Sequence, residues 1–308
     1  MPIVALVLVL IAAVLHAFWN FLAKDARDSS AFMWWGVSIG AVWYTAWMFT
    51  QTWMGMPSEI WLLFAVSIVM EIFYVALITR GYATGDLSQV YPIARGTPPL
   101  FIAFFSALFL GERLPLLGYV GIVLLVFGVY LASLPALSDL SKPLRALSHL
   151  RQRSPRLGNG MNNRTNGERW RPTQLALLAA VCVAIYSTID KVNMAYISPQ
   201  VYNAWVYVGI GVGYAPVVWS RTNRASTIAE FKTNWRRIAI GSVATIMSYM
   251  LALMGMSMTA ASYVGAVRAT SVVIGALMGW LVLKEKFGAV RVFAAVTMVV
   301  GLLLIAVA

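Results

Sequence analysis

The sequence predicts an all-α integral membrane protein built from two five-helix halves. Of its 308 residues, 60% are apolar and only 11% are charged, against about 25% charged in an average soluble domain. Ten stretches reach the roughly 20 apolar residues that a membrane-spanning helix needs. A slide of the chain by 173 positions pairs Arg95 with Arg268 and Glu112 with Glu285. These observations exclude a soluble enzyme, a disordered chain and a fibre.

The ten predicted helices follow one another with short breaks at proline, glycine or polar residues. Each is a continuous apolar run, not the alternating pattern of about ten residues that is typical of an outer-membrane barrel strand. In lipid every backbone group must bond within the protein, so these runs are expected to be helical. The predicted spans are 3–23, 31–50, 59–80, 86–110, 115–137, 174–194, 200–220, 237–258, 261–283 and 287–308.

The internal repeat divides the chain into 1–137, a polar linker over 138–173, and 174–308. The first helix needs a slide of 167 positions, which pairs Lys24 with Lys191. An odd number of helices in each half makes the two halves cross the membrane in opposite directions. Such inverted repeats are typical of secondary transporters. Glycines four residues apart predict close helix contacts: Gly36 with Gly40, Gly209 with Gly213, and Gly275 with Gly279.

The distribution of positive charge predicts the orientation. Loops after the odd-numbered helices hold 19 of the 23 Lys and Arg residues. The basic side of a membrane protein faces the cytoplasm, so the linker 138–173 is expected to be cytoplasmic and both termini outside the inner membrane. The linker carries a net charge of +6, which favours contact with anionic lipid head groups. A nucleic-acid site is not expected, because no aromatic stacking platform accompanies the charge.

Ionisable residues at membrane depth are costly and mark candidate functional sites. Arg95 and Arg268 are related by the repeat and should approach its pseudo-two-fold axis. A guanidinium offers a planar set of donors that suits a carboxylate or a phosphate, although an ion pair with Glu71 or a bond to a helix-end carbonyl is the structural alternative. Prolines 92, 98 and 99 break the helix around Arg95. The expected substrate-binding residues are Arg95, Arg268, Tyr91, Ser88, Trp19 and Tyr263.

Two residues are the candidates for carrying a coupling proton. Glu71 lies in the middle of the third predicted helix, where an apolar environment favours the protonated form of a carboxyl group. His16 titrates near physiological pH when it is unperturbed. Asp86 and Asp190 lie near predicted helix ends, where water should keep a carboxylate ionised.

With these residues in view, the chain resembles the EamA-type, ten-helix members of the drug/metabolite transporter superfamily. The resemblance rests on the segments 16–20, 85–95, 110–113, 261–264 and 283–285. It implies a secondary carrier, often an exporter of amino acids or other metabolites, with a cavity lined by helices 3, 4, 8 and 9. Two features depart from it: small multidrug relatives use a glutamate where this chain has His16, and characterised relatives keep both termini in the cytoplasm.

The predicted function is therefore alternating-access transport of a small anionic or zwitterionic metabolite, with proton coupling as one mechanism. The chain lacks the P-loop, zinc-protease and nucleophile-elbow motifs, so no enzyme, metal or cofactor is expected. A lipid or lipid-linked-sugar flippase is one alternative. The other is a membrane-embedded lipid-modifying enzyme that uses His16, Glu71 and Asp86. The protein is expected to be a monomer or a homodimer.

Overall fold

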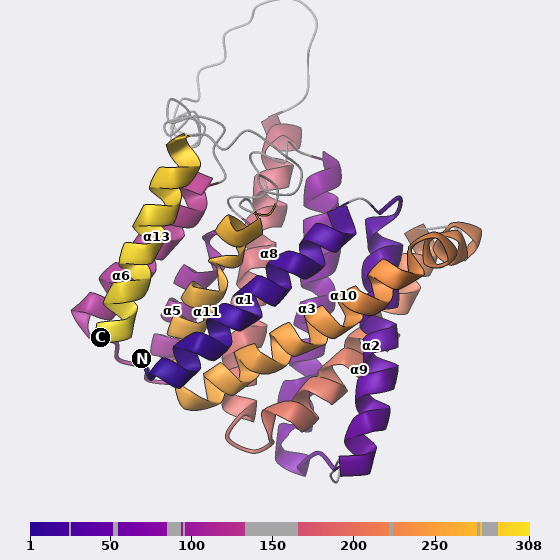
Figure 1. Ribbon diagram of the computed structural model, residues 1–308, viewed down its shortest axis with the longest axis horizontal. Helices are drawn as coiled ribbons and strands as arrows, with labels where there is room; N and C mark the ends of the chain where they lie inside the picture. The colour runs from indigo at the N-terminus through magenta and orange to yellow at the C-terminus, as the bar shows by residue number, and fades with distance from the viewer. Residues whose placement is uncertain are drawn as a thin grey trace, which may run out of the picture.

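The computed structural model describes residues 1–24, 26–51, 55–84, 94, 96–132, 166–221, 224–275, 278 and 289–308. Ten α-helices make up most of this part of the chain, with a short 3-10 turn at Ser58–Ile60 (Figure 1). The helices are α1 (Ile3–Lys24), α2 (Ser29–Gln51), α3 (Trp61–Thr84), α5 (Pro98–Phe109), α6 (Leu116–Ala132), α8 (Asn166–Asn193), α9 (Pro199–Arg221), α10 (Arg224–Met258), α11 (Ala261–Arg268) and α13 (Ala289–Val307).

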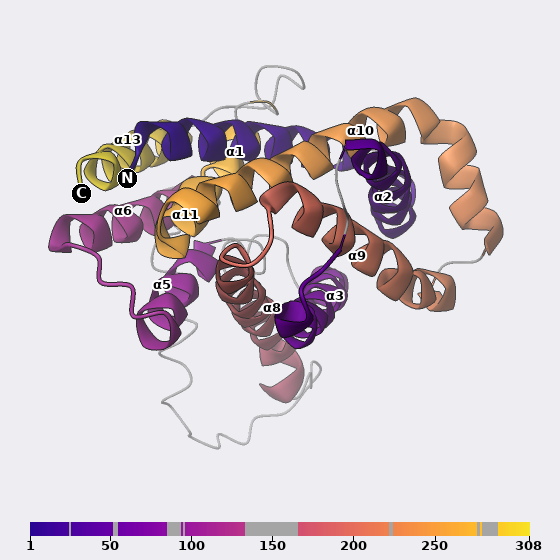
Figure 2. The ribbon, with the colours of Figure 1, turned by 90° about the horizontal axis from the view of Figure 1, so that it is seen from below.

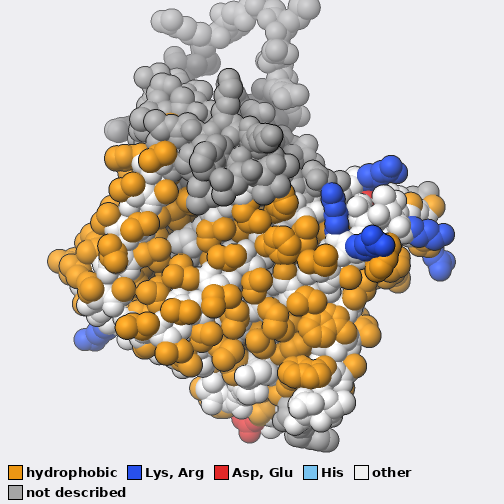
Figure 3. Space-filling model, in the orientation of Figure 1, with side chains coloured by type: hydrophobic (Ala, Val, Ile, Leu, Met, Phe, Trp, Pro, Cys, Tyr) orange, Lys and Arg blue, Asp and Glu red, His pale blue; other side chains and the backbone are white. Residues whose placement is uncertain are grey.

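The outer surface of the bundle confirms that its solvent is lipid. Within the part of the chain that the structure describes, five helical segments are long and apolar enough to cross a membrane: Ile3–Ala23, Ser58–Ile78, Pro172–Asn193, Pro199–Ser220 and Arg224–Met258. Large apolar side chains are exposed along these helices and cover the face seen in Figure 3. An apolar surface of this extent is stable against acyl chains and not against water.

The helix packing has the symmetry that a two-fold repeat requires. By the repeat, α1 corresponds to α8, α2 to α9, α3 to α10 and α6 to α13. Helix α1 packs along α10 and α3 packs along α8, so exchange of the two halves converts one pair into the other (Figure 2). Helices α2 and α6 each pack against their own counterparts, α9 and α13. The halves are therefore interleaved around a shared axis, as in transporters with inverted repeats.

Glycines allow the close approach of these helices, as their spacing predicts. Gly209 and Gly213 of α9 face Ile68 and Ile72 of α3. A Cβ atom on Gly209 would lie only 2.9 Å from Cδ1 of Ile68, so a larger residue would have to displace the Ile68 side chain. The small-residue spacing thus serves packing between the halves.

Two helices are broken at positions that the repeat relates. Helix α5 begins at Pro98, directly after a bend at Thr97, and α11 ends at Arg268 before a turn at Ala269–Thr270. Helical residues resume at 271–275, so the predicted span over 261–283 is interrupted at this turn. Thr97 and Thr270 are 173 positions apart, which is the offset of the repeat. Broken helices at membrane depth are tolerated where they line a cavity.

Helix α10 begins earlier than the sequence predicts. The predicted span started at 237, whereas the helix starts at Arg224 and changes direction at Asn234, whose backbone is not helical. The side chain of Asn234 donates to Glu230, and Glu230 in turn accepts from the backbone N–H of Asp28 in the loop before α2. These contacts hold the first part of α10 as a separate helical segment that turns away from the bundle (Figure 2). The basic residues 224–237 therefore lie on a helix and not in a loop.

Candidate functional site

A small cavity lies where the two broken helices meet. Its volume is about 120 Å³, enough for roughly four water molecules at ~30 Å³ each. It is lined by residues of α1, α3, α5, α8, α10 and α11, and by Ser271 and Val272 after the second break. Its polar lining is made of His16, Tyr74, Tyr186, Ser187, Arg268 and Ser271. Both halves of the protein thus contribute to one polar chamber.

A cluster of two carboxyl groups and a tyrosine is buried beside this cavity. Glu71 of α3 is 8% exposed, Asp190 of α8 is fully buried, and Tyr249 of α10 lies between them. The Tyr249 hydroxyl oxygen lies 2.9 Å from Oε1 of Glu71 and also makes a short hydrogen bond with Oδ2 of Asp190. The cluster joins a helix of the first half to two helices of the second.

Asp190 has the richer set of hydrogen-bond donors. Its Oδ1 accepts from Ser67 Oγ and from Tyr202 Oη, each at 2.7 Å. Tyr202 is held in place by Asn193, whose Nδ2 donates to the Tyr202 hydroxyl at 2.9 Å. Donors of this kind stabilise the ionised form of a carboxyl group. Asp190 is therefore the group of the pair whose hydrogen bonds favour the ionised form.

The Tyr249 hydroxyl has a single hydrogen, which it can donate to only one of the two carboxyl groups at a time. The other contact is a full hydrogen bond only where that carboxyl group is protonated and donates to the tyrosine oxygen. Because Asp190 already accepts from Ser67 and Tyr202, Glu71 is the group of the pair better placed to hold a proton.

Arg268 connects the cavity to the carboxyl cluster. Its side chain lines the cavity, and its guanidinium carbon lies 5.2 Å from the centroid of the Tyr249 ring. It is also close enough to interact electrostatically with both Glu71 and Asp190. The positive charge of Arg268 offsets negative charge on the two carboxyl groups, which lowers the cost of burying them at membrane depth.

The structure brings some of the predicted site residues together and separates others. His16 and Arg268 line the same cavity, and Glu71 lies in the adjoining cluster. Arg95, Tyr91 and Ser88 fall outside the described residues, as does Asp86.

Trp19 and Tyr263 lie elsewhere. The centroid of the Trp19 ring lies 5.3 Å from that of the Phe32 ring, and the Trp19 ring packs against Gly36 and Gly241. It therefore fills the space between α1, α2 and α10. The Tyr263 hydroxyl points at Gly118 of α6. Neither residue lines the cavity, and neither is carried into the proposed binding site.

Asp190 is a candidate site residue that the sequence argument set aside. Its position near the end of α8 predicted an ionised carboxylate in contact with water, and the structure corrects this because Asp190 is fully buried. Its neighbour Lys191 reaches away from it and donates to the carbonyl oxygens of Met256 and Thr259 at the end of α10. The sequence did contain a sign that Asp190 belongs to a polar cluster. Ser187, Asp190 and Asn193 are spaced three residues apart and therefore form one polar face of the helix.

The motif around Glu112 has a structural role. Gly111, with φ of 65°, ends α5 in the left-handed conformation that glycine tolerates. The Glu112 side chain then accepts from the backbone N–H of Ala261 at 2.8 Å and from the Ser262 hydroxyl at 2.7 Å. A carboxylate at this place stabilises the positive N-terminal end of α11. The motif therefore fixes the short helix that carries Arg268.

The fold and the site define a class, that of polytopic α-helical membrane proteins with two interleaved halves and a polar chamber between them. The chain belongs to the EamA-like transporter family, which matches residues 3–134 and 171–307. A solved structure described as "Crystal structure of protein" shares the fold with a TM-score of 0.72 at 14% identity, over 98% of this chain and 96% of that one. The comparison with curated proteins gave no significant match.

Proposed function

We propose that this protein is a secondary active transporter of a small anionic or zwitterionic metabolite, and that the chamber around Arg268 is its binding site. Membership of a transporter family supports the class. The single observation that carries the site is that two repeat-related helix breaks adjoin one chamber that contains Arg268. Transporters with inverted repeats bind their substrates at broken helices of this kind.

The chemistry of the chamber favours an anionic group. The guanidinium of Arg268 can donate two parallel hydrogen bonds to a carboxylate or a phosphate. Pro98 and Pro99, at the N-terminus of α5, line the same space, and the positive end of the helix dipole favours negative charge there. The hydroxyl groups of Tyr74 and Tyr186 are suited to orient the rest of the ligand. Arg95, the repeat counterpart of Arg268, remains a proposed second ligand.

The size of the chamber supports alternating access. At about 120 Å³ it is smaller than the 300–1,000 Å³ that is usual for small-molecule sites. Entry of a metabolite therefore requires the two halves to move apart at this point. Because the chamber is lined by both halves, their relative movement opens it toward one side of the membrane or toward the other.

Proton coupling through Glu71 follows from the charge balance of the site. An anion bound to Arg268 neutralises the positive charge nearest to the carboxyl pair. The negative charge of Asp190 is then uncompensated, which favours the protonated form of Glu71. Release of the anion reverses this change. Glu71 is the proton carrier in this scheme, Asp190 holds the residual charge, and His16 is the second candidate for proton exchange at the cavity.

The direct test is transport by purified protein in liposomes. A panel of carboxylated and phosphorylated metabolites is screened for thermal stabilisation, and each stabilising compound is tested for counterflow. We expect Arg268→Ala to abolish counterflow, whereas the matched variant Arg113→Ala, in the loop after α5, retains it. Unchanged counterflow in Arg268→Ala would remove this residue from the site. Lipid translocation or lipid turnover without metabolite counterflow would favour a flippase or a lipid-modifying enzyme instead.

A further inference from the structure

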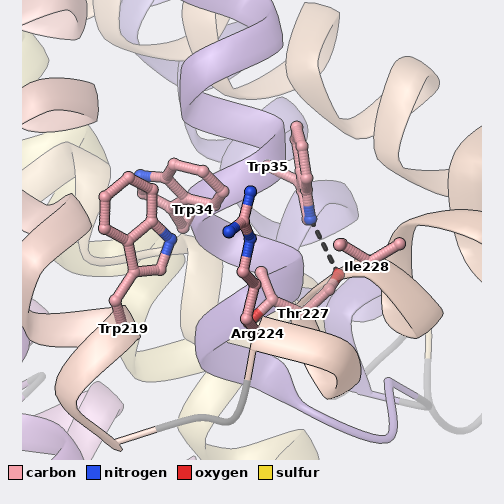
Figure 4. A pocket seen from close by; sticks show the side chains of 6 residues that line it. All are labelled: Trp34, Trp35, Trp219, Arg224, Thr227 and Ile228. Carbon is pink, nitrogen blue, oxygen red and sulfur yellow. Dashed lines mark hydrogen bonds between the residues drawn. The ribbon is translucent and has the colours of Figure 1, made fainter.

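A second, larger cavity lies away from the proposed transport site, at the basic end of the bundle. Its volume is about 530 Å³. It is lined by Trp34 and Trp35 of α2, Trp219 of α9, and Arg224, Thr227 and Ile228 at the start of α10 (Figure 4). None of these residues adjoins the helix breaks or the carboxyl cluster, so transport chemistry as proposed does not use them.

The aromatic walls of this cavity are held in place. The indole N–H of Trp34 donates to the carbonyl oxygen of Gly211 at 2.9 Å, and that of Trp35 donates to the carbonyl oxygen of Thr227 at 2.9 Å. The Trp34 ring also contacts those of Trp35 and Trp219, at centroid distances of 4.8 and 5.8 Å. Three tryptophans from two helices therefore form a fixed wall against which a ligand can pack.

Arg224 supplies a positive charge at the centre of this wall. In Figure 4 its side chain extends between Trp35 on one side and Trp34 and Trp219 on the other. Within the described part of the chain its guanidinium makes no ion pair. Glu230, one turn and a half further along, is engaged instead with Asp28 and Asn234. The charge of Arg224 is thus available to a ligand.

The surroundings of the cavity are cationic on one side and lipid-facing on the other. Lys232, Arg236 and Arg237 are exposed on the same helix, and basic side chains gather at this edge in Figure 3. Trp219 is 60% exposed and Ile228 is 41% exposed, so apolar surface leads out of the cavity toward the acyl chains. Tryptophan and basic residues side by side are typical of the membrane–water interface.

We propose that this cavity binds an anionic phospholipid, with the phosphate on Arg224 and the glycerol and first acyl carbons against Trp34 and Trp219. Arg224 offers the planar fork of donors that matches a phosphate. The apolar wall and the open lipid-facing edge fit the part of the ligand that a free phosphate lacks. The anionic lipids of the cytoplasmic leaflet meet this basic edge if the orientation follows its positive charge. The bound lipid would tie α2 and α9 to the start of α10.

The experiment compares lipid retention by full-length protein after delipidation and exposure to equimolar phosphatidylglycerol and phosphatidylcholine. Native mass spectrometry counts the lipids that remain bound. We expect preferential retention of phosphatidylglycerol by the wild type and about tenfold weaker retention by Arg224→Gln, the effect of losing a hydrogen bond to a charged group. Trp219→Ala should also weaken retention, because it removes the apolar wall.

The matched control is Lys232→Gln, which removes the same charge from the same helical segment but does not line the cavity. It should retain phosphatidylglycerol as the wild type does. Equal losses in Arg224→Gln and Lys232→Gln would show diffuse attraction to a basic surface and would overturn the proposal. Inorganic phosphate that displaces phosphatidylglycerol in a competition would show a free-anion site and would overturn it as well. All variants are first compared with the wild type by size-exclusion chromatography and circular dichroism.

Discussion

Removal of one oxygen atom from Tyr249 tests the buried carboxyl cluster. In Tyr249→Phe, Glu71 Oε1 loses its contact at 2.9 Å and Asp190 Oδ2 loses its short hydrogen bond. A hydrogen bond to a charged group contributes about 1.5–3 kcal/mol, and one between neutral groups about 1 kcal/mol. The variant should therefore be destabilised by about 2.5–4 kcal/mol, which thermal unfolding in lipid–detergent micelles will detect.

The matched control is Tyr207→Phe, on the neighbouring helix α9. The Tyr207 ring lies 6.2 Å from that of Tyr249, and its hydroxyl donates at 2.7 Å to the carbonyl oxygen of Thr245, a neutral group. Its loss should cost about 1 kcal/mol. Infrared difference spectroscopy provides the second measurement, because a buried protonated carboxyl group has its own carbonyl-stretch band.

The wild type should show one such band, which Glu71→Gln removes. Tyr249→Phe should shift the band to higher frequency, because Glu71 loses the oxygen to which it donates. Tyr207→Phe should leave the band in place. A wild-type spectrum with no protonated carboxyl group, or equal destabilisation in the two tyrosine variants, would refute the inference that Glu71 is the protonated member of the pair.

Three further predictions concern helix termination, packing and orientation. Glu112→Ala should lower the free energy of unfolding by about 1 kcal/mol, since the cap of α11 is lost, and an unchanged unfolding temperature would contradict that role. Gly121→Ala should destabilise by about 1–3 kcal/mol, because a Cβ there would lie 2.8 Å from the Gly301 carbonyl oxygen. Gly275→Ala, with no atom of the described residues within 4 Å of its Cβ, should be tolerated. In a cysteine-free background, an impermeant thiol reagent should label Ser58→Cys in intact cells and Ser226→Cys only after permeabilisation, and the reverse pattern would show that the orientation is inverted.

The architecture could be predicted from the sequence because lipid simplifies the problem. An apolar run of helix length can satisfy its backbone hydrogen bonds within a bilayer only as a helix. The matches at an offset of 173 positions reveal the repeat directly. The ends of the helices could be predicted less well from the sequence. The start of α10 looks polar in sequence, and its helical form depends on contacts of Glu230 with Asp28, some 200 positions away in the chain.

The site could be predicted only in part. Arg268 could be predicted because arginine is rare at membrane depth and because the repeat pairs it with Arg95. Glu71 could be predicted from its depth in the membrane alone. Asp190 escaped because a position near a helix end does not reveal burial, which depends on α3, α9 and α10 packing over it. The repeat could not help either, because Ala23 and Ala244 occupy the positions that correspond to Asp190 and Glu71. The cluster is thus an asymmetric feature on a symmetric scaffold, and only the packing of specific helices assembles it.

The claim that Glu71 couples a proton to transport is tested most directly in liposomes with an imposed pH gradient. Wild-type protein and Glu71→Gln are compared with a substrate identified by counterflow. The glutamine keeps the size of the side chain but cannot exchange a proton. We expect Glu71→Gln to exchange substrate across the membrane and to lose accumulation driven by the gradient. Gradient-driven accumulation by Glu71→Gln at the wild-type level would contradict the account.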